Sequence, residues 1–598
     1  MFIRRAPTRR NADGVPYHTF RLVESRREGA RVRQSTLLNL GSTFDLPEPL
    51  WPDLCVRLAQ LLGQRDDLLA ANVPETVETL AQSLAARLIS SRAEPLPVCD
   101  FVEVDVSSLE LTRPRSVGVE QVGLHALAQL EFEPLLESLG INAITRAMIL
   151  AQVVARMAAP GSELATWRWL NDTSALGELL DLSFTDLSLM RLYRAGDVLL
   201  KHQEAIEAAL FERVRSLFGL ETTVTLYDLT NTYFEGAAAL NPKARRGHSK
   251  EKRTDCPLLT LGLILDGSGF VRRSRVFDGN AVEGRTLETM LTDLSAPIGA
   301  LVVMDRGIAT EANLAWLKEK GYRYLVMSRE ALRIAPEGET TLTTAGGDTL
   351  KVMKVLDAAA GEVRLYCHSP GREKKELGIT QRFCEAFEAG LTKLKEGLAK
   401  PRGEKRADRL WDRIGKLKER CHGVGRHYEI TLDTDAEGHK AKELKWVKTP
   451  VAGTMLTDPG VYCLRSSEVD WDEEKLWRTY TMLTDLEGVF RSLKSELGLR
   501  PVYHHKEGRS DAHLFITVLA YQAVQVIRRQ LEAKGIHGRW TSLRETLSVQ
   551  RRVTASFTRK DGRTLHVRKA TRPEVALQSI YTALGIDPLP GGTVRSVA

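Results

Sequence analysis

The chain has 598 residues, of which 43% are apolar and 27% are charged, and its formal net charge is +7. These values are typical of a globular protein, and at roughly 150 residues per domain the length predicts about four domains. No apolar stretch follows the basic N-terminal segment, so we expect no secretory signal. The longest apolar run, His513–Ile527, is too short to span a bilayer and is interpreted as a buried helix, not a membrane segment.

The cysteines give a second indication of the environment. The seven of them are scattered along the chain, and no two form a C-x-x-C pair. This pattern favours a reducing compartment and gives no sign of a structural zinc site. We therefore expect a cytoplasmic protein.

The positive charge is concentrated in two places. Residues 371–426 contain 16 Lys/Arg against 9 Asp/Glu, an excess of seven, and residues 243–253 contain six Lys/Arg and one Glu. Concentrated positive charge favours an acidic partner, and nucleic acid is favoured over a membrane. A solvated surface is the competing interpretation of such runs.

The N-terminal part is expected to be mostly helical. Residues 17–41 alternate between apolar and polar side chains on both sides of Glu28-Gly29, which predicts a β-hairpin. Helical patterns then continue to about residue 92, so residues 1–100 are expected to form a hairpin and a helical segment. We interpret residues 101–219, which have helical periodicity almost throughout, as a DNA-binding region.

Near residue 220, strand patterns replace helical ones. Three strands are predicted in succession, at 222–229, 257–267 and 269–280, with a hairpin turn at Asp266–Gly269. A helix, a buried strand ending at Asp305, a second helix and a further strand follow, up to residue 332. Three strands in hairpin succession and then alternating elements predict an α/β fold with a mixed sheet and helices on its faces.

This alternation is interrupted at residues 333–460. Two strand-like pieces lead into a basic helical hairpin, with one helix around Phe383–Leu398 and another around Leu410–Cys421. We interpret this stretch as an inserted domain. Residues 461–535 are expected to complete the core, and residues 536–598 to form a basic C-terminal region with two strands around Asp561-Gly562.

Two aspartates are candidates for chemistry. Asp228 lies on the first predicted strand, and Asp305 directly follows the apolar run that ends at Met304. A carboxylate at the C-terminal end of a buried strand is a recurrent site position in open α/β sheets. A single such residue is more often a turn or helix-capping aspartate, but a pair in one sheet strengthens the functional interpretation.

Two neighbouring carboxylates repel each other unless a cation offsets their charge. Magnesium binds carboxylates and phosphate oxygens, and two such ions can support a phosphodiester displacement. Glu487 is the candidate third acid, because it borders the apolar stripe of a helix predicted over residues 480–497. Arg491 and Lys494 follow it at helical spacing, suited to hold phosphate. Taken alone, this face is equally typical of a surface ion pair.

These motifs resemble the DDE transposases of bacterial insertion sequences, in the branch whose third acid lies in a Y-R-E-K signature. Tyr480, Glu487 and Lys494 match that signature, whereas Leu483 stands where it has arginine; Arg491 is our candidate replacement. The stretches "YDLTNTYFEG" and "VVMDRG" resemble the two aspartate motifs, and "GHSKEKRTDCP" and "FDGNAVEGRTLETM" resemble the stretches between them. The resemblance covers about residues 220–525.

The resemblance implies an RNase H-like core with Asp228, Asp305 and Glu487 as catalytic metal ligands for two Mg²⁺ or Mn²⁺ ions. It implies cleavage at transposon ends and strand transfer into target DNA, within a homodimer or a higher synaptic complex. The partners would be double-stranded DNA of the terminal inverted repeats and of the target, in the bacterial cytoplasm near the nucleoid. Tyr480, Arg491 and Lys494 would contact phosphates, and so would the basic residues in the neighbouring motifs, Lys250, Arg253 and Arg306.

Other residues and functions remain open at this point. Glu283 is a rival acid, although a glutamate at a helix start has a structural explanation. His504 and His505 could contact a metal or phosphate, but packing histidines are commoner. The competing functions are an RNase H-like nuclease without strand transfer and a DNA-binding protein with an inactive core.

Overall fold

The computed structural model describes residues 1–7, 18–28, 31–41, 44–62, 73–91, 101–220, 224–247, 253–294, 299–330, 332–338, 340–344, 347–421 and 423–598. The chain divides into two compact units. The first contains Met1–Leu109 with the short segments Phe557–Leu565 and Val597–Ala598. The second contains Glu110–Ser556 with His566–Ser596, and it holds the candidate site.

The first unit has a three-stranded antiparallel sheet and two helices. These elements are β1 (Phe2–Pro7), β2 (His18–Glu28), β3 (Arg31–Gly41), α1 (Trp51–Leu61) and α2 (Glu75–Ser91). Glu28 pairs with Arg31, which confirms the predicted hairpin, although its turn lies outside the described residues. Buried side chains such as Leu22 and Leu54 form the core of this unit.

One strand of the N-terminal region was not predicted. β4 (Val104–Ser116) belongs to a four-stranded sheet with the order β18-β17-β16-β4, together with β16 (Arg551–Arg559), β17 (Thr564–Ala570) and β18 (Val594–Val597). Its sequence alternates at Val104–Val106 and Leu109–Leu111, a strand signal that the helical interpretation overlooked, although most side chains of β4 are exposed. The expected helical region 101–219 therefore begins with a strand, and its helices start only at Gly118. The predicted strands β16 and β17 are confirmed.

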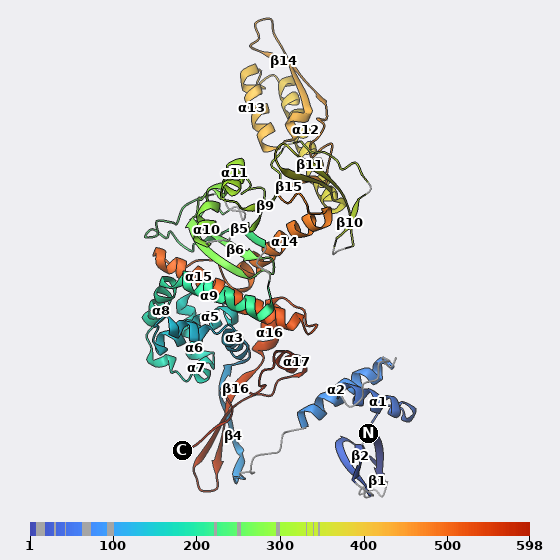
Figure 1. Cartoon of the computed structure of the whole chain (residues 1–598), viewed down its shortest axis with the longest axis vertical. Coiled ribbons are helices and arrows are strands. Elements are labelled where there is room, and N and C mark those ends of the chain that lie inside the picture. Colours follow the sequence, from blue (N-terminus) through green and yellow to red (C-terminus); the bar gives the residue numbers. More distant parts are fainter. Residues whose placement is uncertain are drawn as a thin grey trace. The chain divides into compact units, whose positions relative to one another are not determined.

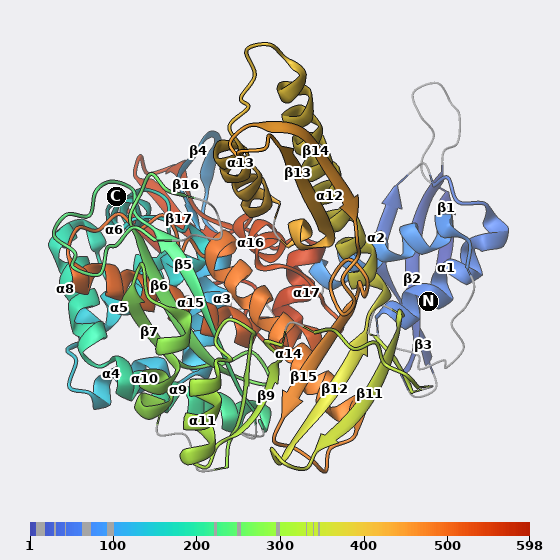
Figure 2. The same ribbon diagram turned by 90° about the horizontal axis from the view of Figure 1, so that it is seen from above.

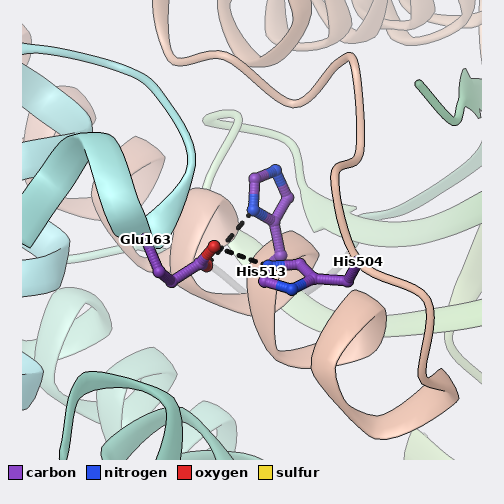
Figure 3. A group of neighbouring side chains, drawn as sticks. All are labelled: Glu163, His504 and His513. Carbon is purple, nitrogen blue, oxygen red and sulfur yellow. Dashed lines mark hydrogen bonds and ion pairs between the residues drawn. The ribbon is translucent and has the colours of Figure 1, made fainter. Parts of the chain in front are cut away.

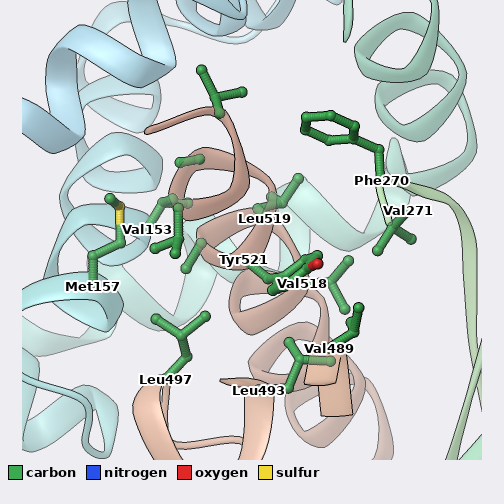
Figure 4. Packing of buried hydrophobic residues seen from close by; sticks show 14 of the residues in the cluster. Val153, Met157, Phe270, Val271, Val489, Leu493, Leu497, Val518, Leu519 and Tyr521 are labelled. Atoms are coloured by element: carbon green, nitrogen blue, oxygen red, sulfur yellow. The ribbon is translucent and has the colours of Figure 1, made fainter. Parts of the chain in front are cut away.

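The helices that follow β4 pack around one long helix from the C-terminal half of the chain, α15 (Glu507–Glu532). They are α3 (Gly118–Gln129), α4 (Phe132–Ser138), α5 (Ala143–Ala158), α6 (Glu163–Asp172), α7 (Leu176–Leu179), α8 (Leu189–Lys201) and α9 (Gln203–Phe218). Figure 4 shows Val518, Leu519 and Tyr521 of α15 among side chains of neighbouring elements. The long apolar run is thus a buried helix, as predicted. Among the described helices, none is long and apolar enough to cross a bilayer.

A nine-stranded mixed sheet occupies the centre of the second unit (Figure 1), in the order β10-β11-β12-β15-β9-β8-β5-β6-β7. Its predicted strands are confirmed as β5 (Val224–Tyr233), β6 (Leu258–Asp266), β7 (Val271–Asp278), β8 (Leu301–Met304) and β9 (Arg323–Met327). β5, β6 and β7 pair antiparallel, and β8 pairs parallel with both β5 and β9. Apolar side chains cover both faces: Tyr227 packs with α10 (Leu287–Leu294) and α11 (Glu311–Glu319), and its neighbour Leu226 faces the main core.

The strands of the predicted insertion extend this same sheet. They are β10 (Thr341–Thr343), β11 (Thr349–Asp357) and β12 (Glu362–His368), and β15 (Val461–Ser466) joins them to β9. Figure 2 shows β11, β12 and β15 side by side. Beyond them lie α12 (Pro370–Ala399), α13 (Ala407–Arg420), β13 (Tyr428–Thr434) and β14 (Ala441–Lys448), which share a small core of their own.

Helix α12 begins earlier than the apolar spacing from Phe383 predicted. The Ser369 hydroxyl accepts a hydrogen bond from the Arg372 N–H, and Pro370 occupies the first helical position. Both features favour a helix start. Arg372 is therefore held in the first turn of a helix and not in a loop.

Gln522 attaches helix α15 to the edge of the sheet. Its side-chain oxygen accepts a hydrogen bond from the Val271 N–H (3.2 Å), and its amide donates to the Val271 carbonyl (2.6 Å). Both residues are buried. Nearby, the Ser268 carbonyl accepts from Gln525 (3.3 Å) and from Arg529 (2.8 Å).

We expect Gln522→Leu to lower the free energy of unfolding by about 2–4 kcal/mol, because two buried backbone groups lose their partner. Gln525→Leu is the matched control and should cost less than about 1 kcal/mol, because Arg529 still donates to the Ser268 carbonyl. Denaturant unfolding of both variants, followed by circular dichroism, measures the difference. Equal losses would contradict this role of Gln522.

Candidate active site

Asp228 and Asp305 lie side by side on neighbouring strands. β5 and β8 run parallel, and Tyr227 pairs with Met304, so the two aspartates are the next residues on strands about 4.8 Å apart. Asp305 directly follows the end of β8, as expected. Asp228 does not end its strand: β5 continues to Tyr233 because β6 pairs with it along its whole length. The aspartates therefore meet where the parallel pairing ends.

Backbone donors fix both carboxylates. Asp228 Oδ1 accepts a hydrogen bond from the N–H of Leu229 at 2.7 Å. Asp305 Oδ1 accepts from the N–H groups of Gly307 (2.9 Å) and Ile308 (3.2 Å). Both side chains are half-buried. Their orientation is thus set by the main chain before any ligand binds.

Helix α14 (Glu473–Arg491) carries Glu487 and lies against β5, β8 and β9. Its C-terminal part buries Val489 and Phe490, while Glu487 is exposed. The side chain of Leu486, which we expected in the apolar stripe, lies outside the described residues. A π-helical turn, η5 (Ser492–Glu496), follows directly and buries Leu493.

The segment after η5 is joined to the strand of Asp228. The Thr232 hydroxyl donates to the Leu499 carbonyl (3.0 Å), and the Val502 N–H donates to the Tyr233 carbonyl (2.8 Å). Arg500 lies between these two attachments. The helix of Glu487 and the strand of Asp228 are therefore fixed to each other through the backbone.

The three acids line one cavity of about 710 Å³. Tyr480, Arg491 and Lys494 line it too, so six of the residues singled out in the sequence meet there. The other lining residues are Thr230, Met327, Ser369, Arg372, Tyr462, Thr481, Leu483, Phe490, Ser495 and Arg500. Three carboxylates and several cations around one open space can hold divalent ions and an anionic substrate.

Burial raises the pKa of Tyr480, and the nearby charge of Asp305 raises it further. Arg372 opposes this shift and Asp228 adds to it, so all three lie within electrostatic reach of the phenol. The hydroxyl therefore stays protonated near neutral pH. A protonated phenol at this position can donate a hydrogen bond to a phosphate oxygen.

Two other expected phosphate contacts, Arg306 and Arg253, do not line this cavity. Arg306 is exposed and donates to the Arg329 carbonyl (3.2 Å). Arg253 pairs with Asp255 (2.7 Å), lies over the Tyr233 ring (4.5 Å to its centroid) and lines a separate cavity of about 420 Å³. Lys250 lies outside the described residues.

The rival acid Glu283 is also absent from the cavity lining. It begins the short helix η3 (Glu283–Arg285). Its carboxylate lies close to Gly307, where a Cβ atom in place of the glycine hydrogen would collide with the Glu283 carboxylate. Glu283 thus packs beside the loop that follows Asp305.

Sequence reasoning missed Arg372, Tyr462 and Arg500. Arg372 lies inside the stretch interpreted as an insertion, and Tyr462 lies on the strand that directly follows it. Only the continuous sheet brings both to the cavity. The helix-start signature at Ser369-Pro370 was a signal that could have placed Arg372 at a helix N-terminus. It could not have indicated which site that helix faces.

A second cluster of polar side chains lies inside the helical region (Figure 3). Glu163 Oε2 is 2.5 Å from His504 Nε2, and Glu163 Oε1 is 3.4 Å from His513 Nδ1. Arg156 Nη2 lies 3.1 Å from the same His513 nitrogen and 3.8 Å from Glu163 Oε1. All four side chains are buried. His504 is therefore a packed residue of this cluster and does not line the cavity.

Two imidazoles and a carboxylate are common metal ligands, but the charge balance here favours a closed ion-pair network. A guanidinium only donates, so His513 Nδ1 accepts from Arg156 and the neutral ring carries its proton on Nε2. Arg156 and Glu163 then cancel each other. A divalent ion would leave two uncompensated positive charges in a buried site, at a cost of several kcal/mol per charge.

The lowered pKa of His513 fits this neutral arrangement. Burial and the charge of Arg156 lower the pKa of His513 from 6.5 to about 4, although Glu163 opposes the shift. Burial alone would raise the pKa of Glu163, but its contacts with His504 and His513 outweigh burial, and the pKa lies well below its usual value.

We expect His513 to make the fold sensitive to acid. Between pH 6.5 and about 4, the unfolded chain binds a proton at this histidine and the folded chain does not, so stability falls as the pH falls. The shift corresponds to about 3 kcal/mol across this window. His513→Asn keeps an acceptor near the Nδ1 position and removes the titration, so its unfolding free energy should fall less on acidification.

Urea unfolding at about pH 7 and about pH 4.5 measures this effect. The control is His537→Asn, which changes an exposed histidine. A wild-type pH dependence in the His513 variant would show that this residue does not supply it.

Comparison with known proteins identifies the family of the chain. A family model described as "Transposase DDE domain" matches residues 220–523, which contain all three acids. No curated protein sequence matches the chain. Among solved structures, the chain is similar to one described as "Cryo-EM structure of piggyBac transposase synaptic complex with hairpin DNA (SNHP)", with 10% identity and a TM-score of 0.32. That similarity covers 73% of this chain and 83% of the other.

The identification rests on the family model, which spans just over half of the chain and runs from the start of β5 into α15. It contains the strands of both aspartates, the extended sheet and the helix of Glu487. The chain therefore belongs to the family of transposases with this DDE domain, and it is an enzyme of DNA transposition.

Proposed function

We propose that the chain is the transposase of a bacterial insertion sequence, of the branch with the Y-R-E-K signature, and that Asp228, Asp305 and Glu487 are its catalytic acids. The observation that carries this proposal is the single cavity lined by all three, with Tyr480 and Lys494 at the signature spacing beside Glu487. The strand order β7-β6-β5-β8-β9 supports an RNase H-like core within the larger sheet.

The three carboxylates form a donor set that fits two Mg²⁺ or Mn²⁺ ions, because these ions prefer carboxylate oxygens and share phosphate oxygens with a substrate. When bound, such ions supply Lewis acidity and a reactive hydroxyl nucleophile for phosphodiester displacement. Hydrogen bonds from the Leu229, Gly307 and Ile308 amides keep the aspartates oriented for them.

The other side chains of the cavity act on the DNA. Arg491 and Lys494 offset the charge of a phosphodiester beside Glu487, and the protonated hydroxyl of Tyr480 donates to one of its oxygens. Water first cleaves the DNA at the ends of the element. The resulting 3′-hydroxyl then attacks a target phosphodiester, forms the new bond and releases one strand end of the target.

Cleavage and joining at two ends require two active sites, so the working form is a homodimer or a higher complex on double-stranded DNA. We assign the helical region 101–219 and the basic region 536–598 to binding of the terminal inverted repeats. The protein acts in the bacterial cytoplasm, near the nucleoid.

Alanine at Asp228, Asp305 or Glu487 should lower metal-dependent cleavage at least about a thousandfold, because the ligand set loses a carboxylate. DNA binding should persist. The assay combines purified protein, Mg²⁺ and a duplex carrying the inverted repeat that flanks the gene. Glu474→Ala is the control, because it removes an exposed acid from the same helix.

Full cleavage by any of the three variants would contradict the assignment of that residue. Cleavage without joining of the 3′ end to a plasmid would instead show a nuclease. Absence of metal-dependent cleavage by the wild type would indicate an inactive DNA-binding protein.

Tyr480→Phe tests the phosphate contact separately. It removes one hydroxyl from a half-buried site and should lower the single-turnover cleavage rate about tenfold with little change in melting temperature, as loss of one hydrogen bond to a charged group predicts. An unchanged rate would exclude the hydroxyl from the reaction.

A further inference from the structure

The cavity has a second wall that does not come from the helix of Glu487. Arg372, in the first turn of α12, and Tyr462, on β15, line the cavity together with Leu483 of α14. Leu483 is the position where the Y-R-E-K signature has arginine. The cavity therefore lacks a cation at that position, whereas Arg372 supplies one from a different helix.

Arg372 is held in a fixed orientation on two sides. Its Nε donates to Glu376 Oε1 at 2.9 Å, and its guanidinium carbon lies 4.9 Å from the centroid of the Tyr462 ring. The Tyr462 hydroxyl accepts in turn from the Trp477 indole N–H (2.9 Å). A guanidinium carries four further N–H donors on its Nη atoms, so these contacts do not exhaust its capacity to bind a phosphate.

The anchoring carboxylate is shared between two arginines. Glu376 is buried and also accepts from Arg333 Nη1 (2.5 Å) and from the Gly460 N–H (2.8 Å). One carboxylate faces two guanidinium groups, so the group of three keeps a net charge of +1. The side chain of Arg372 is 32% exposed, so part of this charge is accessible from the cavity.

We propose that Arg372 binds a phosphodiester of the DNA strand in the active site and, in addition to Arg491, compensates for the arginine that is missing at position 483. This inference rests on the proposed function of the cavity. Arg372 lies within electrostatic reach of Tyr480, which also senses Asp305 and Asp228, so the bound phosphate lies close to the reacting one. The insertion thus supplies a substrate contact from an element other than the helix of Glu487.

A salt titration of DNA binding tests the contact. The probe is a fluorescent duplex carrying the inverted repeat that flanks the gene, bound in Ca²⁺ in place of Mg²⁺. Each phosphate contact contributes about 0.9 to the slope of log K against log salt. We expect Arg372→Ala to lower that slope by about 0.9 and to weaken binding about tenfold.

The matched control is Arg382→Ala, which removes an exposed arginine from the same helix. It should keep the wild-type slope. A wild-type slope in the Arg372 variant would overturn the proposal. An equal decrease in both variants would also overturn it, because the slope would then report the basic surface of α12 and not this site.

Arg372→Lys separates charge from orientation. Lysine keeps the positive charge but cannot form the fork of a guanidinium or its stacked arrangement on Tyr462. The salt slope should stay at the wild-type value, while the single-turnover cleavage rate at saturating DNA should fall about tenfold. If Arg372 has only a structural role, Arg372→Ala should lower the melting temperature but leave the salt slope of the folded protein at the wild-type value. That result would also overturn the proposal.

Failure of this inference can be distinguished from failure of the proposed function. Asp305→Ala is assayed for cleavage in parallel. If it is inactive and Arg372→Ala has the wild-type slope, the cavity is the active site and Arg372 is not a phosphate contact. If Asp305→Ala cleaves like the wild type, the proposed site itself is wrong.

Discussion

The central constraint on this fold is that three carboxylates must be held around one cavity although their charges repel one another. Parallel pairing of β5 with β8 places Asp228 beside Asp305, and backbone N–H groups fix both side chains. Glu487 comes from a helix that lies across the same strands, and the segment after that helix is bonded back to β5. Each acid is thus attached to a rigid element, so the three carboxylates stay close together despite their repulsion. A bound cation can relieve that repulsion.

The positive groups are arranged differently from the acids. Arg491 and Lys494 lie on the same helix as Glu487, whereas Arg500 lies on the connection to α15 and Arg372 on the first turn of α12. A DNA strand in the cavity would therefore meet cations from several elements. Because the nine-stranded sheet is continuous from β7 to β10, the strands of the insertion hold Arg372 in a fixed relation to the aspartates. A flexibly attached insertion could not do this.

The buried cluster of Glu163 shows the opposite solution to the same electrostatic problem. There, one carboxylate, one guanidinium and two imidazoles lie in contact, the charges of Arg156 and Glu163 cancel, and burial together with the charge of Arg156 keeps His513 neutral. The cluster joins α5 and α6 to α15, and α15 is also bonded to β7 through Gln522. Charge balance therefore distinguishes this structural network from the candidate site, even though both contain residue types that can bind metals.

Much of the core followed from the sequence, because its strands and helices have clear apolar periodicity and clear turn residues. The three acids, Tyr480 and Lys494 were identified from motif spacing, which is local information. By contrast, β4 was missed although its sequence alternates, because the helical pattern that follows it was extended back over it. The early start of α12 was missed because only the apolar spacing was used to locate that helix. The sequence by itself determined which residues are the candidates for the chemistry. Only the tertiary structure decided that the insertion shares the core sheet and that Arg372 reaches the cavity while Arg306 does not, because pairing between distant strands is set by the packing of the whole sheet.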